Sequence, residues 1–353
     1  MKKYLTLGMI ALASLTCQAQ TDVSNFVPGS TLEGVNYYMP RTAFRVVVEA
    51  EKTITTPGEL NKYAFKYLRM KDVPTETSTA WRILKISLEP FGMPDKSKAY
   101  NIKVKSKTLA PLVSLTRDGI LLAINKECVE STLSALPEGK TADPLQNPKK
   151  YMSQEILAAN STAKMAELCA QEIYDIRESY NALIRGEADN TPKDGAQLKL
   201  MLDQLNLQAE TLEGLFKGTT QTSTHVFTLN VDPQEEGEQI LFRFSSFLGL
   251  VDADDLSGRP IYLSLNNMNS TPAPVEDPAI ALKKEKMEKG IYYNVPAREA
   301  VSIYDDQQTY VKGEFPMGQF GSVEILSNAL FNKNVTTKVS FYQTTGGVEK
   351  IEN

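Results

Sequence analysis

The segment Gly34-Val35-Asn36-Tyr37-Tyr38-Met39-Pro40 precedes the strand-like stretch Phe44-Arg45-Val46-Val47-Val48-Glu49-Ala50. Gly290-Ile291-Tyr292-Tyr293-Asn294-Val295-Pro296 has the same order of Gly, apolar, any, Tyr, any, apolar and Pro. Three identities in seven positions also arise by chance, so a structural repeat and a coincidence both stay open. A repeat predicts that both segments follow one backbone path, with Tyr37 and Tyr293 buried against a sheet.

The hydrophobic periodicity divides the chain into three zones. Residues 20–150 and 219–353 contain β-branched and alternating stretches separated by turn residues, which is typical of strands. Residues 151–218 instead carry two amphipathic helical stripes, separated by a polar break around Pro192. The sequence therefore predicts an α+β fold of two β-rich regions with a long antiparallel helical hairpin between them. We expect the hairpin to lie against the β-structure.

The N-terminus has the features of a secretory signal peptide over residues 1–19. Lys2 and Lys3 precede a short apolar run, and Cys17-Gln18-Ala19 offers small residues for cleavage before Gln20. The alternative is a lipoprotein signal with Cys17 acylated, but Thr16 stands where that processing prefers Gly, Ala or Ser. No other apolar run approaches the ~20 residues of a transmembrane helix. These features predict export to the periplasm, the cell surface or the medium.

Composition excludes one class of partner. The formal charge of −5 becomes −7 once the two lysines of residues 1–19 are removed. A mildly acidic chain with scattered lysines has no basic stripe for a phosphate backbone, so nucleic acid is not an expected partner.

Two cysteines, Cys128 and Cys169, remain after cleavage. An oxidising compartment permits a disulfide between them. Cys169 nevertheless falls on the apolar stripe of the first predicted helix, and free cysteine is among the most buried residue types. We therefore expect two buried, unbridged thiols.

Several segments together resemble a known family. They are residues 34–41, 173–179, 242–245, 256–260, 290–297 and 342–351. In these segments, which span nearly the whole mature chain, the sequence is similar to a family of exported proteins of Gram-negative gut anaerobes that is described only as a domain of unknown function. The resemblance implies an envelope location and one shared architecture. It implies no activity, ligand or catalytic residue.

No residue pattern predicts a catalytic, cofactor-binding or metal site. His225 is the single histidine and lies in a strand-like stretch without an acidic neighbour, which indicates a strand position rather than a ligand or base. Asp252, Asp254 and Asp255 are carboxylates of the kind that bind calcium, but the EF-hand spacing fails at Ser257 and Leu263, which favours a solvated turn. The pairs Asp305-Asp306 and Glu235-Glu236 are interpreted as charged loop residues.

Aromatic residues raise the possibility of a sugar-binding platform. Trp81 is the single tryptophan, and the candidates are Tyr37-Tyr38 and Tyr292-Tyr293. Tyrosines that alternate at strand starts are more often part of the packing, so we expect these rings to pack within the protein.

The leading functional hypothesis is a non-enzymatic binding or assembly module of the envelope, with an envelope protein or a glycan as partner and no cofactor. A glycan-directed hydrolase with paired carboxylates is the first alternative, since 43 acidic residues leave such a pair open. A structural cell-surface component is the second. A cleft with two facing carboxylates favours the hydrolase, and an exposed apolar patch favours binding or assembly.

Overall fold

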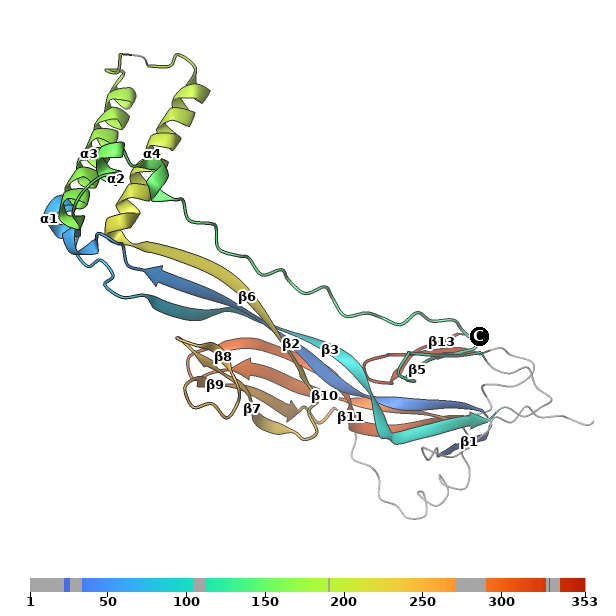
Figure 1. Cartoon of the computed structure of the whole chain (residues 1–353). Coiled ribbons are helices and arrows are strands. Elements are labelled where there is room, and N and C mark those ends of the chain that lie inside the picture. Colours follow the sequence, from blue (N-terminus) through green and yellow to red (C-terminus); the bar gives the residue numbers. More distant parts are fainter. Residues whose placement is uncertain are drawn as a thin grey trace, which may run out of the picture.

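The computed structural model describes residues 22–25, 34–103, 112–189, 191–270, 290–327, 330 and 337–352. Of these residues, 47% lie in strands and 23% in helices. The molecule is elongated, with a stacked pair of sheets in the middle, the long helices at one end and a small sheet at the other (Figure 1).

The first sheet is built on two very long strands. Its order is β1 (Asp22–Asn25), β3 (Ser78–Lys103), β2 (Val35–Thr56) and β6 (Thr219–Val231), all antiparallel. In β2, Phe44, Val46, Val48 and Ala50 are buried at alternate positions, because successive side chains of a strand point to opposite faces. From Phe44 to Ala50, these four apolar side chains of β2 therefore lie on the same face of the sheet.

The second sheet covers that apolar face. Its strands, in spatial order, are β11 (Thr309–Ser327), β10 (Gly290–Tyr304), β9 (Arg259–Asn267), β7 (Gly237–Ser245) and β8 (Gly249–Val251). The two sheets share one core, which includes Phe44, Phe242, Ile261, Val301 and Met317. Burial of each large apolar side chain in such a core stabilises the fold by about 1.5–3 kcal/mol.

Helices form a second core at one end of the first sheet. They are η1 (Asn61–Tyr63), α1 (Ala64–Leu68), η2 (Pro148–Tyr151), α2 (Gln154–Leu157), α3 (Thr162–Arg185) and α4 (Gly195–Lys217). Ser161 caps α3 by accepting the N–H of Lys164, and Gly186 ends it with a positive φ of 70°. Ile173, Leu212 and Phe216 are fully buried between the helices.

The predicted α+β fold with a helical hairpin between two β-rich regions is wrong. The described residues are mostly β and form three antiparallel sheets. Strand β6, which follows α4, pairs with β2 from Phe44 to Thr56, and strands from both sides of the helices fill one core. The long helices extend from the end of the first sheet instead of lying against a β-face (Figure 1). Local periodicity did not reveal this, because it does not specify which strands pair across a long insertion.

A third sheet closes the opposite end. Its order is β13 (Val348–Glu352), β12 (Lys338–Phe341), β5 (Leu121–Ile124) and β4 (Val113–Leu115). Each of its two hairpins follows one long hairpin along the chain, β4–β5 after β2–β3 and β12–β13 after β10–β11. The N-terminal and C-terminal parts of the chain therefore have the same succession of elements.

The two Gly-x-x-Tyr-x-x-Pro segments occupy equivalent places in this succession. Both are extended, at the starts of β2 and β10, as predicted. Tyr38 donates its N–H to Gly119 O (2.8 Å), and Asn294, the matching residue, donates to Gly346 O (3.1 Å). Both acceptors are turn glycines of the following short hairpin, with φ of 84° and 73°. The predicted burial holds for Tyr37, which is 1% exposed, but Tyr293 is only half-buried.

The two segments also contact each other. The Tyr37 hydroxyl donates to Tyr292 O (3.2 Å) and accepts from the Tyr292 N–H (3.0 Å). In return, the buried Asn294 amide donates to Pro40 O (3.0 Å) and to Thr345 O (2.8 Å). These bonds join the first, second and third sheets at one point.

The two cysteines are unbridged, as expected. Cys169 is buried in the helical core, and this burial raises the pKa of its thiol to about 11. Cys128 is half-exposed, so the expected burial holds for Cys169 alone. The predicted signal peptide lies outside the described residues. Within the described part of the chain, no helix is long and apolar enough to cross a membrane.

Candidate functional site

An extended arm, residues 126–147, leads from β5 to the helical end across the outer face of the first sheet (Figure 1). Arg45 and Glu89, a cross-strand ion pair on that face, hold its middle. Arg45 Nη2 donates to Ser134 O (2.6 Å), and the Ser134 N–H donates to Glu89 Oε1 (2.9 Å). The Ser134 N–H and hydroxyl, together with Arg45, keep the pKa of Glu89 below its usual value. The arm is therefore fixed against the sheet.

Near the helices the arm meets β6 and then diverges from it. The Thr224 N–H donates to Lys140 O (2.8 Å), and Gln221 Nε2 donates to Asp143 O (3.1 Å). Beyond these bonds, a groove of about 780 Å³ lies between the arm, the start of β6 and α4. The residues that line it are Glu51, Pro57, Gly58, Glu59, Lys140, Thr141, Asp143, Pro144, Leu145, Gln146, Pro148, Leu207, Glu210, Thr211, Gly214, Leu215, Thr219, Thr220, Gln221, Thr222 and Thr224.

Acidic groups and hydroxyls dominate the chemistry of this groove. It contains four carboxylates, Glu51, Glu59, Asp143 and Glu210, against one lysine, Lys140. Glu51 accepts a hydrogen bond from Arg82 Nε (2.7 Å), which lowers the pKa of its carboxyl. An ionised, paired carboxylate of this kind does not serve as a general acid near neutral pH. The other three carboxylates are exposed to the groove and to solvent.

His225 lies on the exposed surface of β6, which confirms the strand interpretation. Its ring lies 5.0 Å from that of Trp81, and its Nε2 is 3.0 Å from Ser223 Oγ. A neutral hydroxyl and an indole do not orient an imidazole as a carboxylate does in a catalytic pair. His225 is therefore a surface residue at the rim of the sheet.

The aspartate cluster after β8 is a turn, as interpreted from the sequence. Asp252 and Asp254 are exposed, and Asp255 Oδ1 accepts the N–H of Ser257 (2.9 Å). Hydrogen bonds from the Ser257 hydroxyl and then from its N–H lower the pKa of Asp255. No group of three or more His, Cys, Asp or Glu side chains within the described ranges is placed to hold a metal ion.

Asp305 differs from its interpretation as a solvated loop residue. Its side chain is buried, and it accepts the N–H groups of Gln307 (2.9 Å) and Gln308 (2.8 Å) and the hydroxyl of Tyr310 (2.8 Å). Its carboxylate also pairs with Arg259 at 3.3 Å. These contacts lower its pKa despite the opposing effect of burial. Asp305 thus holds the β10–β11 turn together.

The tyrosines proposed as a sugar platform pack within the protein. Tyr100 stacks on Tyr292 with centroids 4.4 Å apart, and on Tyr37 at 5.5 Å. The cavity beside them, which also touches Tyr38 and Tyr293, has a volume of about 10 Å³. That volume is too small for a sugar ring, so the packing interpretation is the one that the geometry supports.

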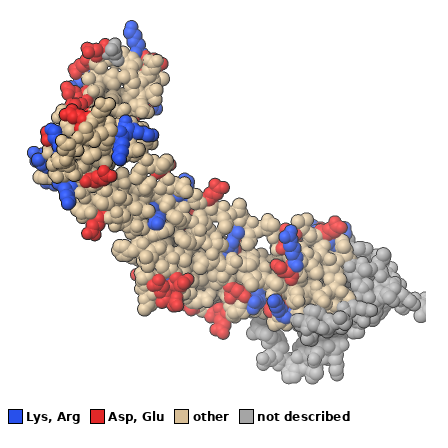
Figure 2. Space-filling view, viewed as in Figure 1, with Lys and Arg blue, Asp and Glu red and all other residues tan. Residues whose placement is uncertain are grey.

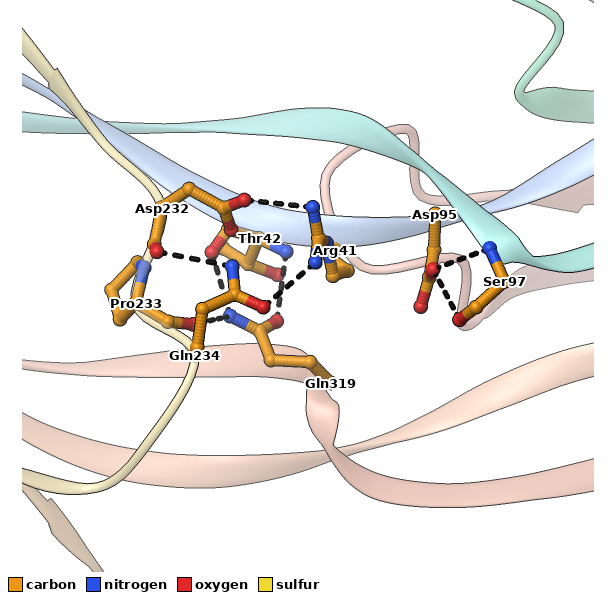
Figure 3. A network of polar contacts seen from close by, with 8 residues as sticks. All are labelled: Arg41, Thr42, Asp95, Ser97, Asp232, Pro233, Gln234 and Gln319. Carbon is orange, nitrogen blue, oxygen red and sulfur yellow. Dashed lines mark hydrogen bonds and ion pairs between the residues drawn. The ribbon is translucent and has the colours of Figure 1, made fainter.

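A polar network joins the edge of the two-sheet core to the β6–β7 connection (Figure 3). Arg41 pairs with Asp232 (2.8 Å) and donates to Gln234 Oε1 (2.8 Å). Gln319 accepts the N–H of Thr42 (2.9 Å) and donates to Thr42 O (2.9 Å) and Pro233 O (3.2 Å). Because each of these contacts ends on the protein itself, the network fastens strands rather than presenting groups to a ligand.

Glu299 is a buried carboxyl that the sequence interpretation missed. It lies on β10 between Ala297 and Val301, on the face that points into the core, and it is 0% exposed. Neither of its oxygens has a hydrogen-bond partner. Burial and, secondarily, the negative charge of Glu236 raise its pKa to about 7. The alternation Ala297, Glu299, Val301, Ile303 was a usable signal, since it places a glutamate in an inward register.

A hollow between the outer halves of α3 and α4 is lined mostly by apolar side chains. Ala182, Leu183, Leu200, Met201 and Leu205 contribute to its lining. Leu200 and Met201 are exposed large hydrophobic side chains. Figure 2 shows acidic and basic side chains along the helical end and broad uncharged surface over much of the middle of the same face.

Comparison of the sequence with models of known protein families identifies one family that matches most of the chain. The model of a domain of unknown function (DUF4831) matches residues 33–349. The chain belongs to that family. No curated protein and no solved structure matches the chain. The DUF4831 match covers both Gly-x-x-Tyr-x-x-Pro segments, the arm and the groove.

Proposed function

We propose that this DUF4831 protein is a non-enzymatic binding module of the cell envelope that holds its partner in the groove between α4, β6 and the arm. The groove carries the proposal. Its volume of about 780 Å³ exceeds the roughly 540 Å³ of the hollow between α3 and α4, and segments far apart in the sequence form its walls. Ligand sites are typically preformed concavities with a few polar groups that fix orientation.

The carboxylates of the groove also make the glycan-directed hydrolase worth testing. A glycosidase needs an acid whose pKa is raised and a second carboxylate across the scissile bond. In the groove, the pKa of Glu51 is shifted in the opposite direction. Glu299 has the raised pKa but is fully buried and lines none of the described cavities. These two observations favour binding over hydrolysis.

The decisive experiment compares two charge-matched variants. Glu59→Gln/Glu210→Gln removes two groove carboxylates, and Glu235→Gln/Glu349→Gln removes two exposed carboxylates elsewhere. In crosslinking to envelope fractions, we expect the wild type and the control variant to capture the same partner and the groove variant to lose it. Equal capture by both variants would remove the groove from the proposal. Polysaccharide turnover by the wild type, lost in the groove variant, would replace binding by hydrolysis.

The envelope location is part of the same proposal, and it depends on the predicted signal peptide. We expect the exported protein to begin at Gln20, because Cys17 and Ala19 supply the small residues before the cleavage site. The intact mass of protein from the envelope and the medium tests this. A diacylated Cys17 N-terminus would show lipoprotein processing instead, and retention of residues 1–19 would contradict export by cleavage.

A structural surface component is the second candidate. The exposed Leu200 and Met201 in the hollow between α3 and α4 favour it, since self-association would bury them. A concentration-dependent dimer in sedimentation velocity, abolished by Leu200→Lys, would support this candidate.

A further inference from the structure

Strand β6 presents an open edge to the groove. It is the outermost strand of the first sheet and pairs with β2 from Thr219 to Val231 without a register shift. Along a strand, backbone N–H and C=O groups of alternate residues point to the same side. The Thr224 N–H points away from β2, because it donates to Lys140 O of the arm. The backbone groups of Thr220 and Thr222 therefore also point away from β2, into the groove.

The arm leaves that part of the edge uncovered. Among the described residues, its one backbone bond to β6 is at Thr224, and it approaches Thr220 and Thr222 only as the far wall of the groove. Both threonines are exposed. An open strand edge pairs readily with another extended chain.

The charged residues around this edge favour a partner chain with positive charge. Glu59, Asp143 and Glu210 surround the groove, and Lys140 is the one cation of its lining. Leu145, Leu207 and Leu215 add apolar wall between them. No aromatic ring lines the groove, which removes the usual stacking surface for a sugar. An extended peptide instead offers main-chain groups to the edge and alternate side chains to the walls.

We propose that the groove receives an extended peptide with basic side chains, which adds to β6 as a further strand at Thr220 and Thr222. This assignment rests on the proposed binding function and names its partner class. Main-chain hydrogen bonds to β6 position the peptide, and its lysine or arginine side chains pair with Glu59, Asp143 and Glu210.

Amide NMR of the full chain tests the proposal with a defined probe, the capped peptide Lys-Val-Lys-Val-Lys. We expect the Thr220 and Thr222 amide signals to shift on titration and their hydrogen exchange to slow. The same peptide with its valine amides N-methylated keeps its charge but lacks alternate donors, so we expect it to bind weakly and without protection. The capped Glu-Val-Glu-Val-Glu peptide is expected not to bind. Equal binding of the N-methylated peptide would overturn strand addition.

Two proline variants isolate the backbone contribution. Thr222→Pro removes an N–H that faces the groove, and Thr228→Pro removes one at an equivalent position on the same edge outside it. Neither N–H bonds to β2, so both variants are expected to keep the sheet. Affinity for the lysine peptide is expected to fall about tenfold in Thr222→Pro, the size of one hydrogen bond, and to stay unchanged in Thr228→Pro.

The charge-matched variants make the test independent of the proline substitutions. Glu59→Gln/Glu210→Gln is expected to weaken peptide binding and its dependence on salt, whereas Glu235→Gln/Glu349→Gln is not. No shift at Thr220 and Thr222, with a partner still captured through the groove from envelope fractions, would overturn strand addition and leave the binding function standing. Equal capture of the partner by the groove variant and its control would instead overturn binding through the groove.

Discussion

Glu299→Gln is expected to stabilise the protein by about 3 kcal/mol at pH 8 and to leave its stability nearly unchanged at pH 4. The wild-type side chain is completely buried in the inward row of β10, and neither carboxyl oxygen has a partner. Its nearest partners across the sheet are Phe315 on β11 and Asn267 on β9, neither of which carries a positive charge. A glutamine is neutral at both pH values and has nearly the same shape.

The direction of the pH dependence follows from the raised pKa. Burial, followed by the charge of Glu236, brings the pKa of Glu299 from 4.5 to about 7 in the folded protein. Between these values the folded state holds a proton that the unfolded state has lost. The free energy of unfolding therefore falls by about 1.4 kcal/mol per pH unit across that window and levels off above pH 7. The destabilising effect of the Glu299 charge is therefore absent below about pH 4.5 and complete above about pH 7.

Urea unfolding of both proteins at pH 4, 6 and 8 measures this difference. Glu314→Gln, an exposed glutamate on the neighbouring strand β11, is the matched control and is expected to stay within about 0.5 kcal/mol of the wild type. The comparison within each pH cancels the opposite dependence from Glu89 and Asp305, whose pKa values are lowered. A constant offset between Glu299→Gln and the wild type at all three pH values would show that Glu299 does not titrate in this range.

The local features of the fold were predictable from sequence, and its assembly was not. The β-branched residues of Phe44–Ala50 indicated a strand, and the shared extended path of the two Gly-x-x-Tyr-x-x-Pro segments was predicted from their matched spacing. The pairing of β6 with β2 across more than 160 residues has no local signal. The stacking of the two sheets into one core likewise depends on long-range contacts, and this is why the α+β prediction was wrong.

The candidate site illustrates the same limit. Glu59, Asp143 and Glu210 lie on three segments that meet only because α4 returns the chain to the end of β2 and the arm crosses the sheet. Nothing in their flanking residues distinguishes them from other solvated acids. Glu299 is the contrary case, since its inward register was readable from alternation alone. The residues that carried a recognisable motif, Tyr37 and Tyr293, belong to the packing between repeats and not to the groove.

Asn294→Ala is expected to destabilise the protein by about 3 kcal/mol, because it removes two hydrogen bonds that join three sheets. The Asn294 amide donates to Pro40 O of β2 and to Thr345 O of the β12–β13 turn. Without it, both carbonyls lose their donor, and a bond deleted in a buried site costs about 1–3 kcal/mol when its partner stays unsatisfied. The Asn294 Oδ1 has no partner of its own, so removing this atom offsets part of the loss.

Urea unfolding measures the expected loss, and amide hydrogen exchange shows where it acts. We expect faster exchange at Gly346, whose N–H bonds to Tyr342 O within the turn that Asn294 holds, and no change in the helical core around Phe216. Asn266→Ala is the matched control, because that exposed asparagine on β9 donates only to Ser264 Oγ (2.9 Å) and its loss is expected to cost a few tenths of a kcal/mol. If both asparagine variants unfold at the same urea concentration, the contact between the two repeat segments does not hold the three sheets together.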